Sequence, residues 1–240
     1  MHATQSDAVQ ECRMRARQIR LHNPDPYYTG HHFEQYLRAA NAAVDGIFHT
    51  AGIDFGLLPC MGKPATRDSF EAAIRERGRR DALASEFLEW YDAQHSGPWH
   101  SAVYTRAVGA ARRTVRTHGR APGVRIMISA SDGYADDPSY EVDTAGLTSR
   151  GRLRSRDELS VEVRRRLPAF LDMVNDKRRR SGEPAASAKD VGAFCFAVVR
   201  HGGKTHAVDM ARAADVYVQA LQRMISESEA RIRDLAAPRP

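Results

Sequence analysis

The chain has 240 residues, of which 42% are hydrophobic and 28% charged, the balance of a globular protein with one large or two small domains. No stretch approaches the roughly 18 apolar residues of a membrane span, and the N-terminal segment is polar, so we expect neither a transmembrane helix nor a secretory signal. Cys12, Cys60 and Cys195 stand apart without metal-ligand spacing, which predicts a reduced, cytoplasmic protein without disulfides.

The net charge of +6 and the isoelectric point near 9.5 are typical of proteins with polyanionic partners such as nucleic acids. Nearly all of the positive charge comes from arginine, since only four lysines occur: Lys63, Lys177, Lys189 and Lys204. Arginine matches phosphate geometry better than lysine does, but a bias in codon usage explains the same excess. The charge therefore suggests a nucleic-acid partner without requiring one.

Three N-terminal segments carry apolar residues at helical spacing, and we predict helices over residues 4–21, 31–50 and 67–95. Between the first two we expect a loop over 22–30, because a proline pushes its preceding residue out of the helical region. Residues 52–66 are expected to form a connector. An aromatic cluster in the third helix is interpreted as core packing rather than as a platform for stacking bases: Phe87, Leu88, Trp90 and Tyr91.

A fourth helix is expected over residues 98–118, since Gly119 and Pro122 form a stop signal after it. Its apolar face comprises Val103, Tyr104, Ala107, Val108, Ala110, Ala111 and Val115. We place Arg112, Arg113 and Arg116 on the opposite half of the helix, and His118 on the apolar side of its last turn. The sequence thus predicts a row of guanidiniums and one imidazole at the end of a buried helix.

Two structural interpretations of these cations compete with a functional one. Cations near a helix C-terminus are favoured by about 0.3–1 kcal/mol through the helix dipole. Arginines opposite an apolar stripe are usually a solvated face. In the functional interpretation, an arginine and the histidine form half of an RNA-cleaving site.

Four helices joined by short loops, each with one apolar face, predict an antiparallel bundle. Within it, three stretches resemble the HEPN superfamily: Phe-x-x-Tyr-Leu-x-Ala-Ala-x-Ala-Ala-Val (Phe33 to Val44), Phe-Leu-x-Trp-Tyr (Phe87 to Tyr91) and Ala-Arg-Arg-x-x-Arg-x-His-Gly (Ala111 to Gly119). The resemblance covers residues 8–120. Its defining motif is an arginine followed, after four to six residues, by a histidine near the end of the last helix.

The resemblance implies that His118 is the motif histidine and that either Arg113 or Arg112 is the motif arginine. The asparagine that often follows the arginine in this family is replaced here by Thr114 or Arg113, depending on the alignment. Many members are metal-independent endoribonucleases, often toxins or antiphage effectors, and others are inactive helpers. In their dimers the arginine and histidine of both chains meet in a shared cleft. A homodimer, an RNA substrate and an antitoxin partner are therefore implied.

The implied chemistry is cleavage next to a ribose 2′-hydroxyl. Histidine titrates near neutrality, so His118 serves as general base on that hydroxyl or as general acid on the leaving oxygen. Arg112 or Arg113 holds the scissile phosphate through its guanidinium fork, and Arg106 and Arg116 are expected to contact the substrate. The products are a 2′,3′-cyclic phosphate and a 5′-hydroxyl, with no metal and no cofactor.

Beyond Gly119 the pattern changes to short strands. We predict strands over 124–130 and 140–144, separated by a turn whose aspartates (Asp132, Asp136, Asp137) are interpreted as turn formers rather than cation ligands. Ser155 and Glu158 form a capping box that opens a helix, which Pro168 is expected to kink. Lys177–Arg180 close that helix with a basic cluster. A polar linker, 181–190, follows.

The chain ends with a predicted hairpin and a long helix. Strands are expected over 193–199 and 204–208, joined by Gly202-Gly203, and Asp209 is expected to cap the final helix. We therefore predict a mainly α protein, with a helical bundle over residues 1–120 and a smaller α+β portion over 121–240. The leading functional hypothesis is the endoribonuclease; a non-catalytic dimeric scaffold or RNA-binding accessory module and a small-molecule pocket in the bundle are the alternatives.

Overall fold

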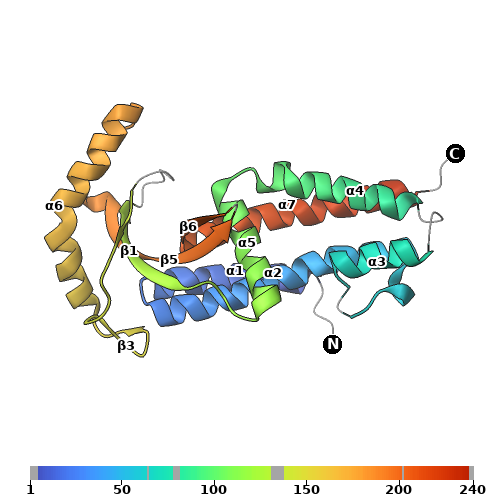
Figure 1. Ribbon diagram of the computed structural model, residues 1–240, viewed down its shortest axis with the longest axis horizontal. Coiled ribbons are helices and arrows are strands. Elements are labelled where there is room, and N and C mark those ends of the chain that lie inside the picture. The colour runs from blue at the N-terminus through green and yellow to red at the C-terminus, as the bar shows by residue number, and fades with distance from the viewer. Residues whose placement is uncertain (1–4, 64, 78–81, 131–137, 202, 238–240) are drawn as a thin grey trace. The chain divides into compact units, whose positions relative to one another are not determined.

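A computed structural model of the chain describes residues 5–63, 65–77, 82–130, 138–201 and 203–237. It confirms a mainly helical protein with a smaller α+β portion (Figure 1). The chain forms two compact units. The first contains residues 1–17, 34–121 and 212–240, and the second contains residues 18–33 and 122–211. The final helix thus groups with the N-terminal helices rather than with the strands that precede it.

The first two helices are α1 (Gln5–His22) and α2 (Pro26–Asp54). The loop expected over 22–30 is much shorter, because α2 starts at Pro26. Asp25 caps this helix: its Oδ1 accepts hydrogen bonds from the backbone N–H groups of Tyr27 (3.0 Å) and Tyr28 (3.4 Å). A proline in the first helical position needs no N–H partner and already has a helical φ. The sequence Asp25-Pro26 therefore opens a helix instead of extending the loop.

The helix predicted over 67–95 is two helices, α3 (Arg67–Arg77) and α4 (Ala82–Ser96). The ring centroids of Phe70 and Phe87 lie 5.9 Å apart. In one continuous helix, seventeen residues would separate these side chains by about 25 Å. Phe48 of α2 packs against both rings, at 5.7 and 6.4 Å, so the aromatic cluster belongs to the core, as expected. A short 3-10 helix, η1 (Leu58–Cys60), connects α2 to this pair.

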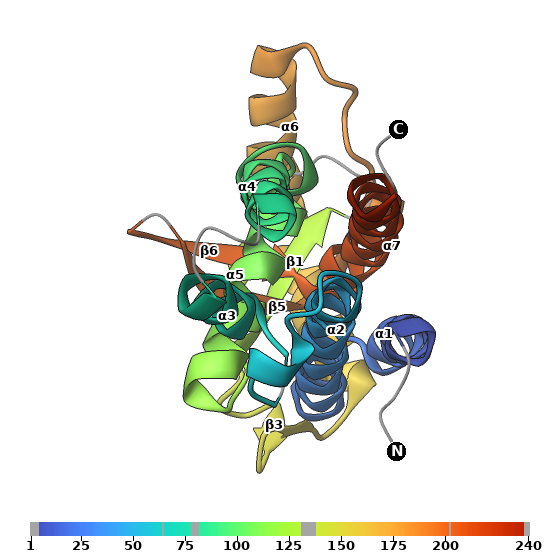
Figure 2. The same cartoon turned by 90° about the vertical axis from the view of Figure 1, so that its right-hand side faces the viewer.

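The first unit is completed by η3 (Pro98–His100), α5 (Val103–His118) and most of α7 (Met210–Ala236). Asp209 caps α7 as predicted, since its Oδ1 accepts a hydrogen bond from the backbone N–H of Ala211 (2.9 Å). The Tyr36 hydroxyl donates to the carbonyl of Ala214 (2.9 Å) and ties α7 to α2. Figure 2 views α3, α4 and α7 nearly end-on, while α5 runs across them. This crossing buries α5 on more than one side.

The second unit contains a four-stranded antiparallel sheet in the order β2-β1-β5-β6. Its strands are β1 (Val124–Ala130), β2 (Tyr140–Glu141), β5 (Val191–His201) and β6 (Lys204–Asp209). The predicted bounds of β1 are confirmed. His201 pairs with Lys204, so the β5–β6 connection spans positions 202 and 203, as the glycine pair predicted. The turn with Asp132, Asp136 and Asp137 lies outside the described residues.

A second, two-stranded sheet was not expected from the sequence. It pairs β3 (Thr148–Ser149) with β4 (Arg152–Leu153). Arg150 and Gly151 form its turn with φ values of 52° and 79°. Two successive positive φ values are the geometry of a type I′ turn. Because arginine rather than asparagine, aspartate or glycine occupies the first of these positions, the sequence pattern does not predict this hairpin.

The helix of the second unit is α6 (Arg156–Ser181), and a short 3-10 helix, η4 (Ala188–Asp190), follows. The Ser155 hydroxyl accepts hydrogen bonds from the backbone N–H groups of Asp157 (3.1 Å) and Glu158 (3.3 Å), so the Ser155 side of the predicted capping box is confirmed. α6 continues through Pro168. In the basic cluster at its end, Arg178 is buried and donates to the carbonyl of Pro184 (3.2 Å).

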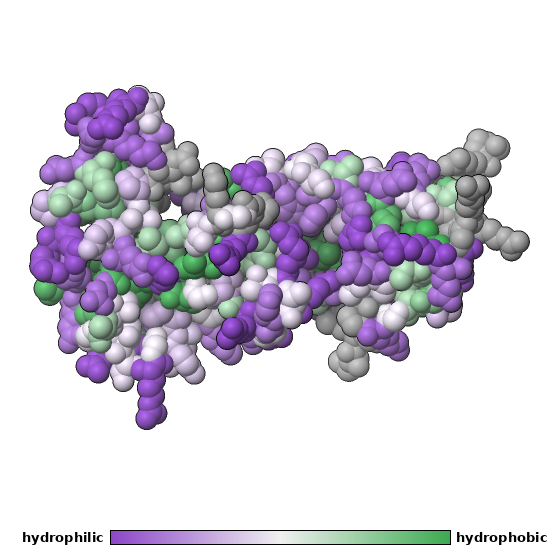
Figure 3. Space-filling model, viewed as in Figure 1, coloured by the Kyte–Doolittle hydropathy of each residue, from purple (hydrophilic) through white to green (hydrophobic). Residues whose placement is uncertain are grey.

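Among the described residues, no helix combines the length and apolarity needed to cross a lipid bilayer. Much of the molecular face in Figure 3 is hydrophilic, with smaller hydrophobic areas between.

Candidate functional site

Helix α5 carries all the residues that the sequence singled out. It ends at Gly119, whose φ of 71° is left-handed and whose N–H donates to the carbonyl of Val115 (2.9 Å). Small residues dominate its middle, and Ala107, Val108, Gly109, Ala110 and Ala111 are all buried. A methyl group on Gly109 would lie 3.0 Å from Nε2 of His100, so the absence of a side chain allows this close approach.

Arg112 is not on the solvated side of α5, and this part of the sequence analysis is wrong. Only 7% of the residue is exposed. It follows Val108 by four residues and precedes Val115 by three, which places it on the buried stripe. Its guanidinium donates to Oδ1 of Asn41 (3.1 Å) and to the hydroxyl of Tyr217. These two bonds and its burial hold the guanidinium within the core, so Arg112 is a structural residue here.

Arg113 and Arg116 are exposed on α5, as expected. Arg116 forms an ion pair with Asp45, with 2.6 Å between NH2 and Oδ1. Arg113 has no carboxylate partner among the described residues. Arg106 is also exposed, but its NH1 donates to the carbonyl of Ser101 (2.5 Å) and so holds the turn before the helix. Of the predicted arginines, Arg113 is the one most available to a ligand.

His118 is exposed, although the helical wheel places it on the apolar side of α5. It occupies the last turn, where residues 116–120 are all exposed. His118 lies five positions after Arg113, which corresponds to about 140° around the helix axis and about 7.5 Å along it. One helix therefore does not direct Arg113 and His118 toward the same phosphate.

Two arginines that the sequence analysis did not select lie at the same end of α5. Arg120 is exposed, and within the described part of the chain it has no carboxylate partner. Arg38 of α2 donates to the carbonyl of Gly119 (2.6 Å), which is one of the carbonyls left open where the helix ends. No sequence pattern links Arg38 to α5, but the seven-residue spacing of Arg106, Arg113 and Arg120 could have identified Arg120. We call Arg106, Arg113 and Arg116 of α5, together with Arg120 just beyond its end, the α5 arginine stripe.

Two histidines of the first unit, His95 and His100, have lowered pKa values. The rings of His95 and His100 pack together with centroids 4.2 Å apart, and Nδ1 of His100 lies 3.0 Å from the carbonyl oxygen of His95. Burial, and then the positive charges of Arg112 and Arg113, lower the pKa of His95 to about 4. Burial, the neighbouring His95 and the same two arginines lower the pKa of His100 to about 3. Burial is the larger cause of both shifts, and the positive charges of Arg112 and Arg113 add to it, so both imidazoles are kept neutral.

No group of three or more histidine, cysteine or acidic side chains in the described ranges is arranged to hold a metal ion. No protein-family model, curated protein or solved structure matches this chain. The site must therefore be interpreted from its own geometry and charge.

Proposed function

We propose that this protein binds RNA through the α5 arginine stripe, as a non-catalytic module. This proposal rests on Arg113 and Arg120, which are exposed and, among the described residues, lack carboxylate partners. Arg113 lies on α5 and Arg120 just after its end. Unpaired guanidiniums are suited to phosphate oxygens, because they present several donors in a planar fork. The positive charge of Arg113 contributes, after burial, to the low pKa values of His95 and His100. The choice of RNA among polyanions rests on the HEPN resemblance.

An endoribonuclease is the second candidate, and the exposed imidazole of His118 favours it. General acid–base catalysis needs groups on both sides of the scissile phosphate. Arg113 and His118 diverge on one helix, so this candidate requires a homodimer in which Arg113 of one copy approaches His118 of the other. Arg112 has no direct role in it, because its guanidinium is buried and bonded to Asn41 and Tyr217.

RNA binding is tested by fluorescence anisotropy over a range of salt concentrations. Replacing Arg113 and Arg120 with alanine removes two phosphate contacts. We expect the slope of log affinity against log salt to become shallower by about 0.7 per contact on single-stranded RNA. The matched control replaces Arg75 and Arg223, which are exposed but already paired with Glu71 and Glu227. An equal loss in both double variants would show that net charge alone, rather than the stripe, holds RNA.

Catalysis is tested separately, by incubating a pool of structured RNA with the protein in EDTA. Cleavage that leaves cyclic phosphate ends and disappears in His118→Ala would establish the second candidate. RNA binding without cleavage would leave the non-catalytic proposal standing.

A further inference from the structure

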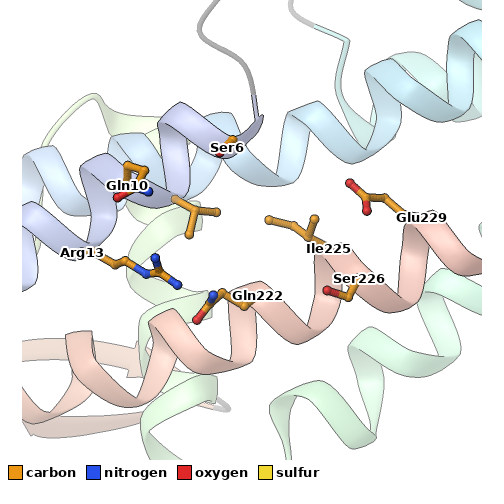
Figure 4. A pocket seen from close by; sticks show the side chains of 8 residues that line it. Ser6, Gln10, Arg13, Gln222, Ile225, Ser226 and Glu229 are labelled. Carbon is orange, nitrogen blue, oxygen red and sulfur yellow. The ribbon is translucent and has the colours of Figure 1, made fainter.

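Helices α1 and α7 of the first unit line a groove of about 260 Å³, distinct from the α5 arginine stripe (Figure 4). The groove is lined by Ser6, Val9, Gln10 and Arg13 of α1, and by Gln222, Ile225, Ser226 and Glu229 of α7. Val9 and Ile225 are half-buried and supply its apolar centre. Polar side chains surround them.

Both sets of lining residues follow the same spacing. Positions 6, 9, 10 and 13 on α1, and positions 222, 225, 226 and 229 on α7, are related as i, i+3, i+4 and i+7. This is the spacing of residues that share one face of a helix over two turns. The groove is therefore bordered by two helical faces, the form of surface into which other helices pack.

The charges in the groove lie at opposite ends. Figure 4 shows Arg13 at one end and Glu229 at the other, with Ile225 between them. Within the described part of the chain, neither Arg13 nor Glu229 has a partner of opposite charge. They cannot pair with each other in one chain, since the length of the groove separates them. A surface with one positive and one negative end is complementary to its own copy after a half-turn.

We propose that this groove is a homodimer interface, in which α1 and α7 of a second copy pack against α1 and α7 of the first. A two-fold axis running across the helices places the Arg13 end of each copy against the Glu229 end of the other. The contact is isologous, so each ion pair occurs twice. The apolar centres around Val9 and Ile225 meet near the axis and exclude water. This interface does not depend on RNA binding.

The first test compares dimer dissociation constants by analytical ultracentrifugation. Glu229→Arg introduces two like-charge contacts per dimer, and we expect it to weaken dimerisation at least about tenfold. Arg13→Glu should do the same, and the double variant Arg13→Glu/Glu229→Arg should recover most of the affinity because the pairs are restored in reverse. Asp234→Arg, which makes the same charge change at an exposed position of α7 outside the groove lining, is the control. A monomeric wild-type protein, or a dimer that the single reversals leave intact, would overturn the proposal.

The second test is disulfide trapping, which does not depend on how strongly each variant associates. The double variant Arg13→Cys/Glu229→Cys should form a dimer cross-linked between chains under mild oxidation. Arg13→Cys and Glu229→Cys alone should not, because each residue faces the other's position in the partner copy. The single variants also control for the half-buried native Cys60. Equal cross-linking in the two single variants and the double variant would contradict the proposed two-fold arrangement.

Discussion

Arg112 and Arg113 are neighbours in sequence with opposite environments. The guanidinium of Arg112 is held in the core by Asn41 and Tyr217, while Arg113 is exposed on the surface. A buried polar group that loses its partner retains the cost of its desolvation. The same residue type therefore serves stability at one position and is available for binding at the next.

We expect Arg112→Ala to lower the free energy of unfolding by about 2–4 kcal/mol, because it leaves a void and removes the partner of the buried Tyr217 hydroxyl and of the half-buried Asn41 amide. Arg113→Ala should change it by less than about 0.5 kcal/mol while weakening RNA binding. Urea unfolding of both variants checks the first effect, and anisotropy checks the second. If Arg113→Ala destabilised the fold as much as Arg112→Ala, the assignment of roles would be wrong.

At the scale of elements, local signals predicted most helices and strands. The cap at Ser155, the glycine stop at Gly119 and the bounds of β1 all follow from short-range chemistry. The errors arose where a local signal has two meanings. Pro26 was interpreted as a loop residue, although a proline after a capping aspartate opens a helix. A helix over 67–95 was also compatible with the periodicity, but the packing of Phe70 on Phe87 requires a turn.

The cap of α2 gives a prediction at this scale. Asp25→Ala should lower the free energy of unfolding by about 0.5–2 kcal/mol, since two amides of the first turn lose their acceptor. Asp25→Asn should retain most of the stability, because asparagine caps helices about as well. Amide hydrogen exchange at Tyr27 and Tyr28 reports the effect directly, with faster exchange expected only in the alanine variant. Equal exchange rates in the two variants would show that the cap is not the stabilising contact.

At the scale of the whole molecule, the core must keep His95 and His100 neutral. Their pKa values in the folded protein, about 4 and about 3, lie below the ordinary histidine value of 6.5. The unfolded chain therefore binds protons near pH 6 that the folded chain does not. Stability is fully present above about pH 6.5 and declines as the pH falls toward 4.

Hydrogen bonds from arginines lower the pKa values of Glu71 and Glu162, whereas burial raises the pKa of Asp45. The histidine contribution between pH 6.5 and 5 is therefore the difference between the native protein and a variant that lacks both imidazoles. We expect urea midpoints to fall across this window in the native protein. The variant His95→Gln/His100→Asn should show a flatter profile, since it has removed both imidazoles. A native profile that is flat down to pH 5 would mean that these histidines are accessible to protons in the fold.

The sequence alone determined the class of this protein and the nature of most of its elements, because helical periodicity, capping residues and turn residues act within a few positions of the chain. Only the tertiary structure decided which cations are available for binding. Arg112 is held in the core by a hydrogen bond to the hydroxyl of Tyr217, which lies 105 residues further along the chain. The tertiary structure also decided that α7 groups with the N-terminal helices and that α7 and α1 border a groove. Such features depend on contacts between distant segments, and no local pattern encodes which distant segment will supply the partner.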